Sequence, residues 1–186
     1  MTPEEAANVL LRNAGLGALE RPPVDPEEIA VEHLDLDVQD HADLRTLPGA
    51  PSLPRGTTLS GLLFPAKRRI WVDARETRRR PGRRSFTIAH EIGHWEMHRD
   101  IGDGIHARFC RSDHVGATAS ELKQSVRLER EANRFAAALL MPEDLLRRQV
   151  SESGLNVLAL ASRFGVSGQA MQIRLETLRL LPDYLL

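Results

Sequence analysis

Residues 85–100 read SFTIAHEIGHWEMHRD and contain the pattern H-E-x-x-H, which runs from His90 to His94. Apolar residues recur around this pattern at helical spacing and predict an α-helix with one buried face. Positions four apart lie on the same face of a helix, so His90 and His94 can bind one metal ion through their imidazoles. The alternative is a structural helix that carries two histidines at this spacing by chance.

The acid inside the pattern predicts the chemistry of the site. Glu91 is rotated by about 100° from His90 around the helix axis, which places its carboxylate beside a metal-bound water instead of on the metal. Zinc lowers the pKa of such a water towards about 7. We expect Glu91 to act as general base on this water, which then attacks a peptide carbonyl that zinc polarises.

A third metal ligand must come from elsewhere, because catalytic zinc usually has three protein ligands and one open position. His98 lies about 12 Å from His90 along the helix axis, too far for one ion to bind both. We therefore expect His98 at the surface or beside the site, and not on the metal. Cys110 and His114 form a C-x-x-x-H pattern in a loop, a weak candidate for a separate structural zinc site.

The better source of a third ligand is the predicted helix over residues 121–141, which contains Glu129 and Glu131. About 200° separates these two acids around the helix, so only one can face the metal. Glu129 lies about 60° from the centre of the apolar face, and Glu131 about 100° from it on the other side. We favour Glu129 as the ligand and keep Glu131 as the alternative. Asn133, one turn after Glu129, is expected to orient a ligand through a hydrogen bond.

The composition is that of an ordinary globular chain, with 41% hydrophobic and 27% charged residues among 186. The formal net charge of −1 gives no general basicity of the kind that nucleic-acid binding requires. The chain has one cysteine, its first residues do not resemble a signal peptide, and no stretch approaches the ~18 apolar residues of a membrane span. We therefore expect a cytoplasmic protein without a membrane partner.

The order of predicted elements favours one domain of α+β class over residues 1–186. It is expected to be mainly helical and zincin-like, with a small N-terminal sheet packed on the H-E-x-x-H helix. Its parts are N-terminal helices with a short strand (1–50), a β-hairpin (57–74), active-site helices with a short strand near 107–109 (85–150), and a C-terminal helical subdomain resembling a helix-turn-helix (155–186).

Two surfaces offer alternatives to the enzyme interpretation. The stretch from Lys67 to Arg84 holds nine basic and two acidic residues, and we expect a solvated loop balanced by the acidic residues 1–50. Contact with DNA or with an acidic protein surface is the alternative.

The C-terminal subdomain is the second such surface. Four of its polar residues could face DNA, but the apolar residues between them favour packing; these four are Gln169, Gln172, Arg174 and Arg179. The open edge of the hairpin is expected to hold a substrate as an added strand.

Two long motifs resemble the ImmA/IrrE family of metallo-endopeptidases. They are FTIAHEIGH at residues 86–94 and EREANRFAAALLMP at residues 129–142. The similarity extends to PVDPEEIA at 23–30, to the hairpin, and to LALASRFGVS at 158–167, and so covers most of residues 20–182.

This resemblance implies a gluzincin-like core in which His90, His94 and Glu129 hold zinc. It also implies a substrate class, the helix-turn-helix repressors of mobile elements or stress regulons. The alternative function is a catalytically weak or inactive regulatory module that binds a repressor or DNA through its C-terminal helices. The sequence does not decide between zinc and manganese as the working metal. We expect a bare peptidase, because the chain has no room for the DNA-binding or sensor domain that some members carry.

Overall fold

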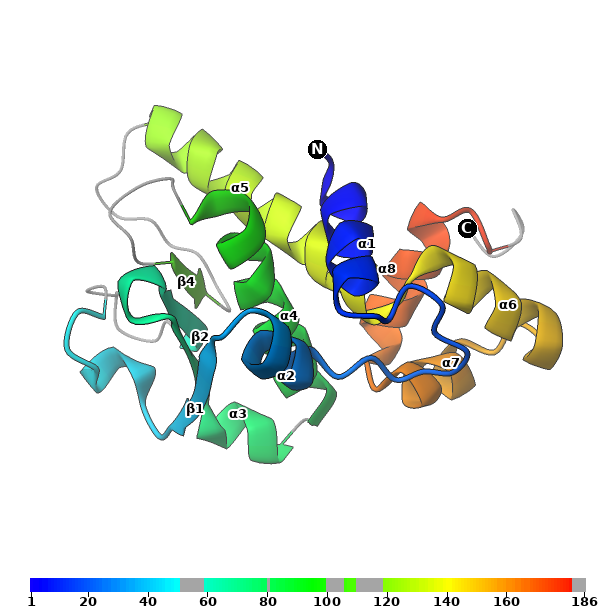
Figure 1. Ribbon diagram of the computed structural model, residues 1–186, viewed down its shortest axis with the longest axis horizontal. Helices are drawn as coiled ribbons and strands as arrows, with labels where there is room; N and C mark the ends of the chain where they lie inside the picture. The colour runs from blue at the N-terminus through cyan, green and yellow to red at the C-terminus, as the bar shows by residue number, and fades with distance from the viewer. Residues whose placement is uncertain (51–58, 80, 100–105, 110–118, 182–186) are drawn as a thin grey trace.

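Two helices, α4 (Pro81–His98) and α5 (Ala119–Leu140), lie side by side at the centre of the fold. The computed structural model describes residues 1–50, 59–79, 81–99, 106–109 and 119–181. In Figure 1 a small sheet lies to the left of α4, and the C-terminal helices lie to the right. The predicted α+β class, mainly helical with a small sheet on the H-E-x-x-H helix, is confirmed.

The N-terminal helices begin where their capping residues predict. In α1 (Pro3–Asn13) the Thr2 hydroxyl accepts a hydrogen bond from the Glu5 amide, and the Glu5 carboxylate accepts one from the Thr2 amide. Asp25 caps α2 (Pro26–Glu28) in a similar way, and a π-helical turn over Ile29–His33 continues it. These caps satisfy amide groups that have no partner inside the helix.

A four-stranded sheet of order β1-β3-β2-β4 covers one side of α4. The predicted hairpin is confirmed, since β2 and β3 pair in antiparallel fashion across a tight turn that ends at Arg68 with φ of +48°. Strand β1 is parallel to β3, and β4 is antiparallel to β2. The strands are β1 (Asp37–His41), β2 (Leu59–Phe64), β3 (Arg69–Asp73) and β4 (His106–Phe109).

The hairpin has no open edge, so this expectation was wrong. Strand β2 lies between β3 and β4, and β3 lies between β1 and β2. All six residues of β2 are buried. The outer strands of the described sheet are β1 and β4, which the pattern of the hairpin alone does not indicate.

The prediction of a solvated loop over residues 67–84 was also wrong, because its described residues lie mostly in strand β3 and in two helices. Residues Ala74–Arg79 form α3, and α4 already begins at Pro81. Several of the arginines make ion pairs with acids, as in the pairs Arg69–Asp37 and Arg84–Glu27. Arg69–Asp37 links β3 to β1, and Arg84, which also pairs with Asp40, holds the start of α4 against α2 and β1.

Helices α4 and α5 approach each other closely at Gly93. A Cβ atom at this position would lie 3.2 Å from Cα of Ala132 and 3.1 Å from the ring of Phe135. Phe135 of α5 and Ile92, which precedes Gly93 in α4, are both fully buried. The missing side chain of Gly93 therefore lets the second helix lie directly against the first.

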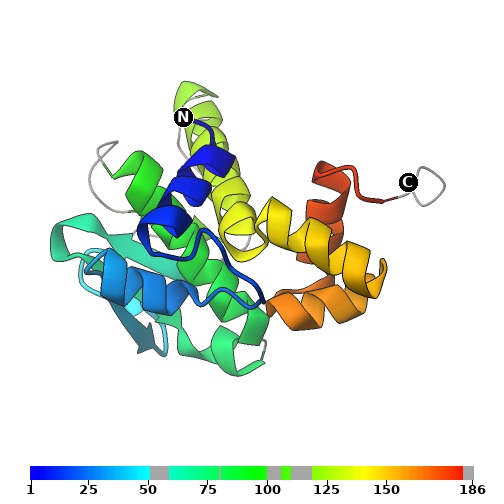
Figure 2. The same cartoon turned by 45° about the vertical axis from the view of Figure 1, so that its right-hand side comes forward.

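The C-terminal helices lie on the far side of α4 and α5 from the sheet, as Figure 2 shows. Residues Met171 and Leu175 of the last helix are fully buried, whereas Ile173 is 54% exposed. Arg174, one of the four residues that could have faced DNA, is buried. This arrangement favours packing over DNA binding. The helices are α6 (Glu143–Ser153), α7 (Val157–Phe164) and α8 (Gly168–Thr177).

The described helices contain none that is long and apolar enough to cross a lipid bilayer.

The buried Arg174 gives a first testable prediction. Its guanidinium donates to both carboxylate oxygens of Glu4, at 2.7 and 2.6 Å, and to the carbonyl of Met141 at 3.0 Å. Arg174→Ala leaves these acceptors without their donor, so we expect the free energy of unfolding to fall by about 3 kcal/mol in urea titrations. Gln169→Ala, at an exposed position of α8, is the control and should change it by less than about 0.5 kcal/mol. A loss below about 1 kcal/mol for Arg174→Ala, the value of an exposed ion pair, would contradict this account.

Candidate metal centre

His90 and His94 of α4 point their Nε2 atoms at one place. The two atoms are 3.0 Å apart, and the side chains are 0% and 2% exposed. The helical repeat explains this, because a spacing of four residues places both rings on the same face, one turn apart. The packing of α4 against the sheet and α5 keeps both rings out of bulk water.

Glu129 of α5 completes the group from the facing helix. One of its carboxylate oxygens is 3.1 Å from His94 Nε2, and the other is 3.3 Å from His90 Nε2. The candidate ligand atoms of the three residues all lie within 4.8 Å of one another. Two imidazoles and one carboxylate are a donor set that suits catalytic zinc and leaves a fourth position open. These residues therefore fit a metal ion, although their role as ligands stays a prediction.

The electrostatics of Glu129 suit a ligand. Burial raises the pKa of its carboxyl group, but hydrogen bonds and charge from His90 and His94 outweigh burial and hold this pKa well below its ordinary value. Its side chain is 31% exposed, far more than either histidine. Glu129 thus carries the negative charge that a metal requires, and it lies on the more open side of the group.

Asn133 lies where the sequence predicted a supporting residue. Its Oδ1 atom is 3.1 Å from Nδ1 of His90. An amide oxygen can only accept, so this contact places a proton on Nδ1 and leaves the lone pair of Nε2 directed at the metal position. A helix turn separates Asn133 from Glu129, which explains why both reach the same histidine.

His98 lies beside the site, one of the two places expected for it, and it contacts Glu131, which the sequence did not predict. His98 is 2% exposed, so it does not lie at the surface, and its Nδ1 is 3.1 Å from Nδ1 of His94. Its Nε2 is 3.0 Å from a carboxylate oxygen of Glu131. Burial lowers the pKa of His98, and the hydrogen bond to Glu131 opposes this shift. The signal in the sequence was the repeated spacing of four from His90 through His94 to His98.

Glu91 is fully buried between α4 and strand β2. Its carboxylate lies against Gly61, where an added Cβ atom would be 2.6 Å from Oε1 of Glu91 and 2.5 Å from Cγ2 of Thr87. Gly61 therefore provides the space that this carboxylate occupies. Nothing in the sequence near Gly61 indicated this contact, because it joins residues 30 positions apart across two elements.

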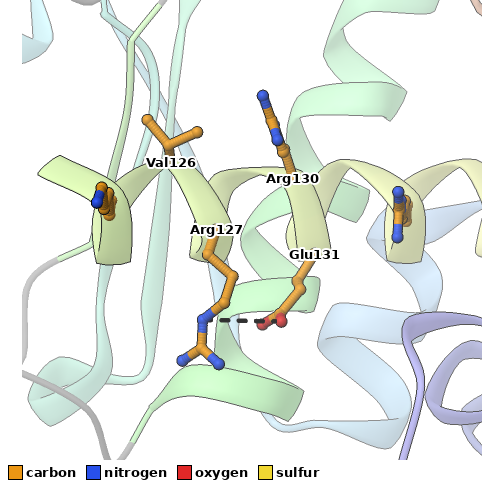
Figure 3. Close-up of a pocket in the computed structure, with 6 residues that line it drawn as sticks. Val126, Arg127, Arg130 and Glu131 are labelled. Carbon is orange, nitrogen blue, oxygen red and sulfur yellow. Dashed lines mark ion pairs between the residues drawn. The ribbon is translucent and has the colours of Figure 1, made fainter.

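A pocket of about 480 Å³ lies along α5 and is not lined by His90 or His94 (Figure 3). Glu131 links this pocket to the site, because it borders the pocket and also contacts His98. The candidate zinc site of Cys110 and His114 lies outside the described residues. The pocket is lined by Lys123, Val126, Arg127, Arg130, Glu131 and Arg134.

Comparison with known proteins gives a family and a fold. The family model of the IrrE N-terminal-like domain, peptidase M78, matches residues 29–176. A search of curated proteins finds no match. Among solved structures, a Mycobacterium tuberculosis transcriptional regulator has a similar fold, with a TM-score of 0.61 and 19% sequence identity. The similarity covers 94% of this chain and 46% of that protein, so the chain spans less than half of its length.

Proposed function

The chain belongs to the peptidase M78 family with an IrrE N-terminal-like domain, and we propose that it is a metal-dependent endopeptidase. The meeting of His90, His94 and Glu129 beside a buried Glu91 supports this proposal most strongly. The donor set suits zinc, with manganese as the alternative working metal.

The proposed mechanism assigns a separate task to each side chain. A zinc ion held by His90, His94 and Glu129 would supply Lewis acidity, which polarises the scissile carbonyl and lowers the pKa of water. Glu91 accepts the proton of the attacking water and then passes it to the leaving amine nitrogen. Asn133 holds the proton on Nδ1 of His90 and thereby fixes the orientation of that ring.

The proposed substrate is a helix-turn-helix repressor of a mobile element or stress regulon. The resemblance to the ImmA/IrrE family and the match of the IrrE N-terminal-like family model support this class. Such repressors act in the cytoplasm, which is the proposed place of action. The burial of Arg174 argues against the alternative of DNA binding through the C-terminal helices.

The substrate class can be tested by co-expression. We expect a small repressor encoded beside the gene to be cut when it is co-expressed with this protein, and to stay intact with Glu91→Gln. Immunoblots of a tagged repressor measure both results. An intact repressor in the presence of metal-loaded wild-type protein would contradict the proposed substrate.

The contact of Glu91 with Gly61 gives a second prediction. Gly61→Ala pushes the Glu91 carboxylate aside, because the new methyl group overlaps with Oε1. We expect kcat to fall by about 10–100-fold while zinc content stays unchanged, since the metal ligands are not moved. Gly168→Ala, at the start of α8, is the matched control. Wild-type kcat in Gly61→Ala would show that the position of Glu91 is not critical.

A further inference from the structure

We propose that His98 and Glu131 are positioning residues that fix the proton and the orientation of the His94 ring. Together they form a relay that runs from Glu131 through His98 to His94. This inference rests on the proposed function, because it treats His94 as a metal ligand.

The contacts of the relay form an unbroken path away from the metal position. Nε2 of His94 lies 3.1 Å from Glu129, and Nδ1 of the same ring lies 3.1 Å from Nδ1 of His98. Nε2 of His98 then lies 3.0 Å from Glu131. The two rings are 5.2 Å apart between centroids and tilted by 57°, so they do not stack face to face.

The positions of the protons follow from these contacts. Two ring nitrogens at hydrogen-bond distance need one proton between them. A carboxylate can only accept a hydrogen bond, so in the contact with Glu131 the Nε2 of His98 carries the proton, and the Nδ1 of the same ring offers a lone pair. Nδ1 of His94 must then be the donor, which leaves Nε2 of His94 free to bind the metal. The opposite arrangement would place a lone pair of His98 against the lone pairs of Glu131.

The surroundings of Glu131 suit this role. Figure 3 shows Arg127 paired with Glu131 along α5, with 4.0 Å between Arg127 Nε and the carboxylate. Four basic side chains border the same pocket, so the carboxylate lies in positively charged surroundings. The side chain of Glu131 is 29% exposed, whereas that of His98 is 2% exposed. The relay thus joins a charged surface to the buried histidine His94.

The two histidines of the site are therefore supported in different ways. His90 donates to a neutral amide of Asn133, whereas His94 donates to a histidine that a carboxylate holds. A carboxylate behind a histidine ligand increases the basicity of that ligand and fixes its ring. The relay is expected to make His94 the stronger of the two imidazole donors.

Two substitutions separate positioning from packing. His98→Phe keeps an aromatic ring in the buried space but removes both nitrogens, and Glu131→Leu removes the carboxylate. We expect each to weaken zinc binding by about 10–100-fold at constant pH. Glu131→Gln retains one oxygen acceptor but can also donate, so its zinc affinity should lie between that of Glu131→Leu and wild type. Arg130 borders the same pocket, but Glu131 is the residue that contacts Nε2 of His98, so Arg130→Gln should bind zinc as the wild type does.

The experiment measures zinc affinity by competition with a chromophoric chelator, together with thermal unfolding of the metal-free proteins. The relay predicts weaker zinc binding in His98→Phe and Glu131→Leu, and altered d–d bands of bound cobalt, with unfolding of metal-free Glu131→Leu unchanged. Wild-type zinc affinity in Glu131→Leu, or a change in unfolding alone, would overturn the relay. Absence of zinc binding by the wild type would instead overturn the proposed function itself.

Discussion

Glu91→Gln is expected to abolish proteolysis while zinc remains bound. The glutamine has the same shape as the glutamate, so it fits beside Gly61 and leaves His90 and His94 in place. An amide cannot accept the proton of the attacking water, and loss of a general base costs roughly 10²–10⁴-fold in rate. Initial rates of peptide cleavage, measured with zinc content on the same samples, test this result.

Glu96→Gln is the matched control for this variant. Glu96 lies on the same helix, is partly buried, and has its pKa raised by burial, with Arg99 opposing that shift. Because it makes no contact with the proposed metal ligands in the structure as described, we expect normal cleavage. Full cleavage by Glu91→Gln would refute the proposed role of Glu91 as general base.

The second large effect is expected from Glu129→Gln, which removes the negative charge of the proposed third ligand. Zinc affinity should fall by more than about 100-fold. Substitution of a residue that only supports a ligand lowers metal affinity by about 10–100-fold, and loss of a ligand should cost more. Glu131→Gln should lose much less, because Glu131 contacts His98 instead of the metal position. Chelator competition on both variants compares the two acids directly. Unchanged zinc content in Glu129→Gln would exclude it as a ligand.

Local sequence patterns were sufficient to predict the elements that carry the site. The helical repeat placed His90 and His94 on one face, and the angular position of Glu129 on its own helix placed it nearer the core than Glu131. The structure brings these three side chains together. The hairpin and the caps at Thr2 and Asp25 followed from equally short patterns.

The features that could not be predicted depend on contacts between distant segments. The arginines of residues 67–84 suggested a solvated loop because their acidic partners, such as Asp37 and Glu27, lie far away in the sequence. His98 was excluded as a ligand by its distance along the helix, but that argument says nothing about a contact with His94. The closeness of Gly61 to Glu91 likewise arises only when the sheet packs on α4.

The central claim is that this chain cuts peptide bonds with a metal held by His90, His94 and Glu129. The most direct measurement is mass spectrometry of new N-termini in a peptide library from a bacterial lysate, treated with zinc-loaded or metal-depleted protein. We predict new N-termini with the zinc-loaded protein and none after metal depletion. Equal numbers with both samples, or none with protein that holds one zinc ion, would contradict the claim.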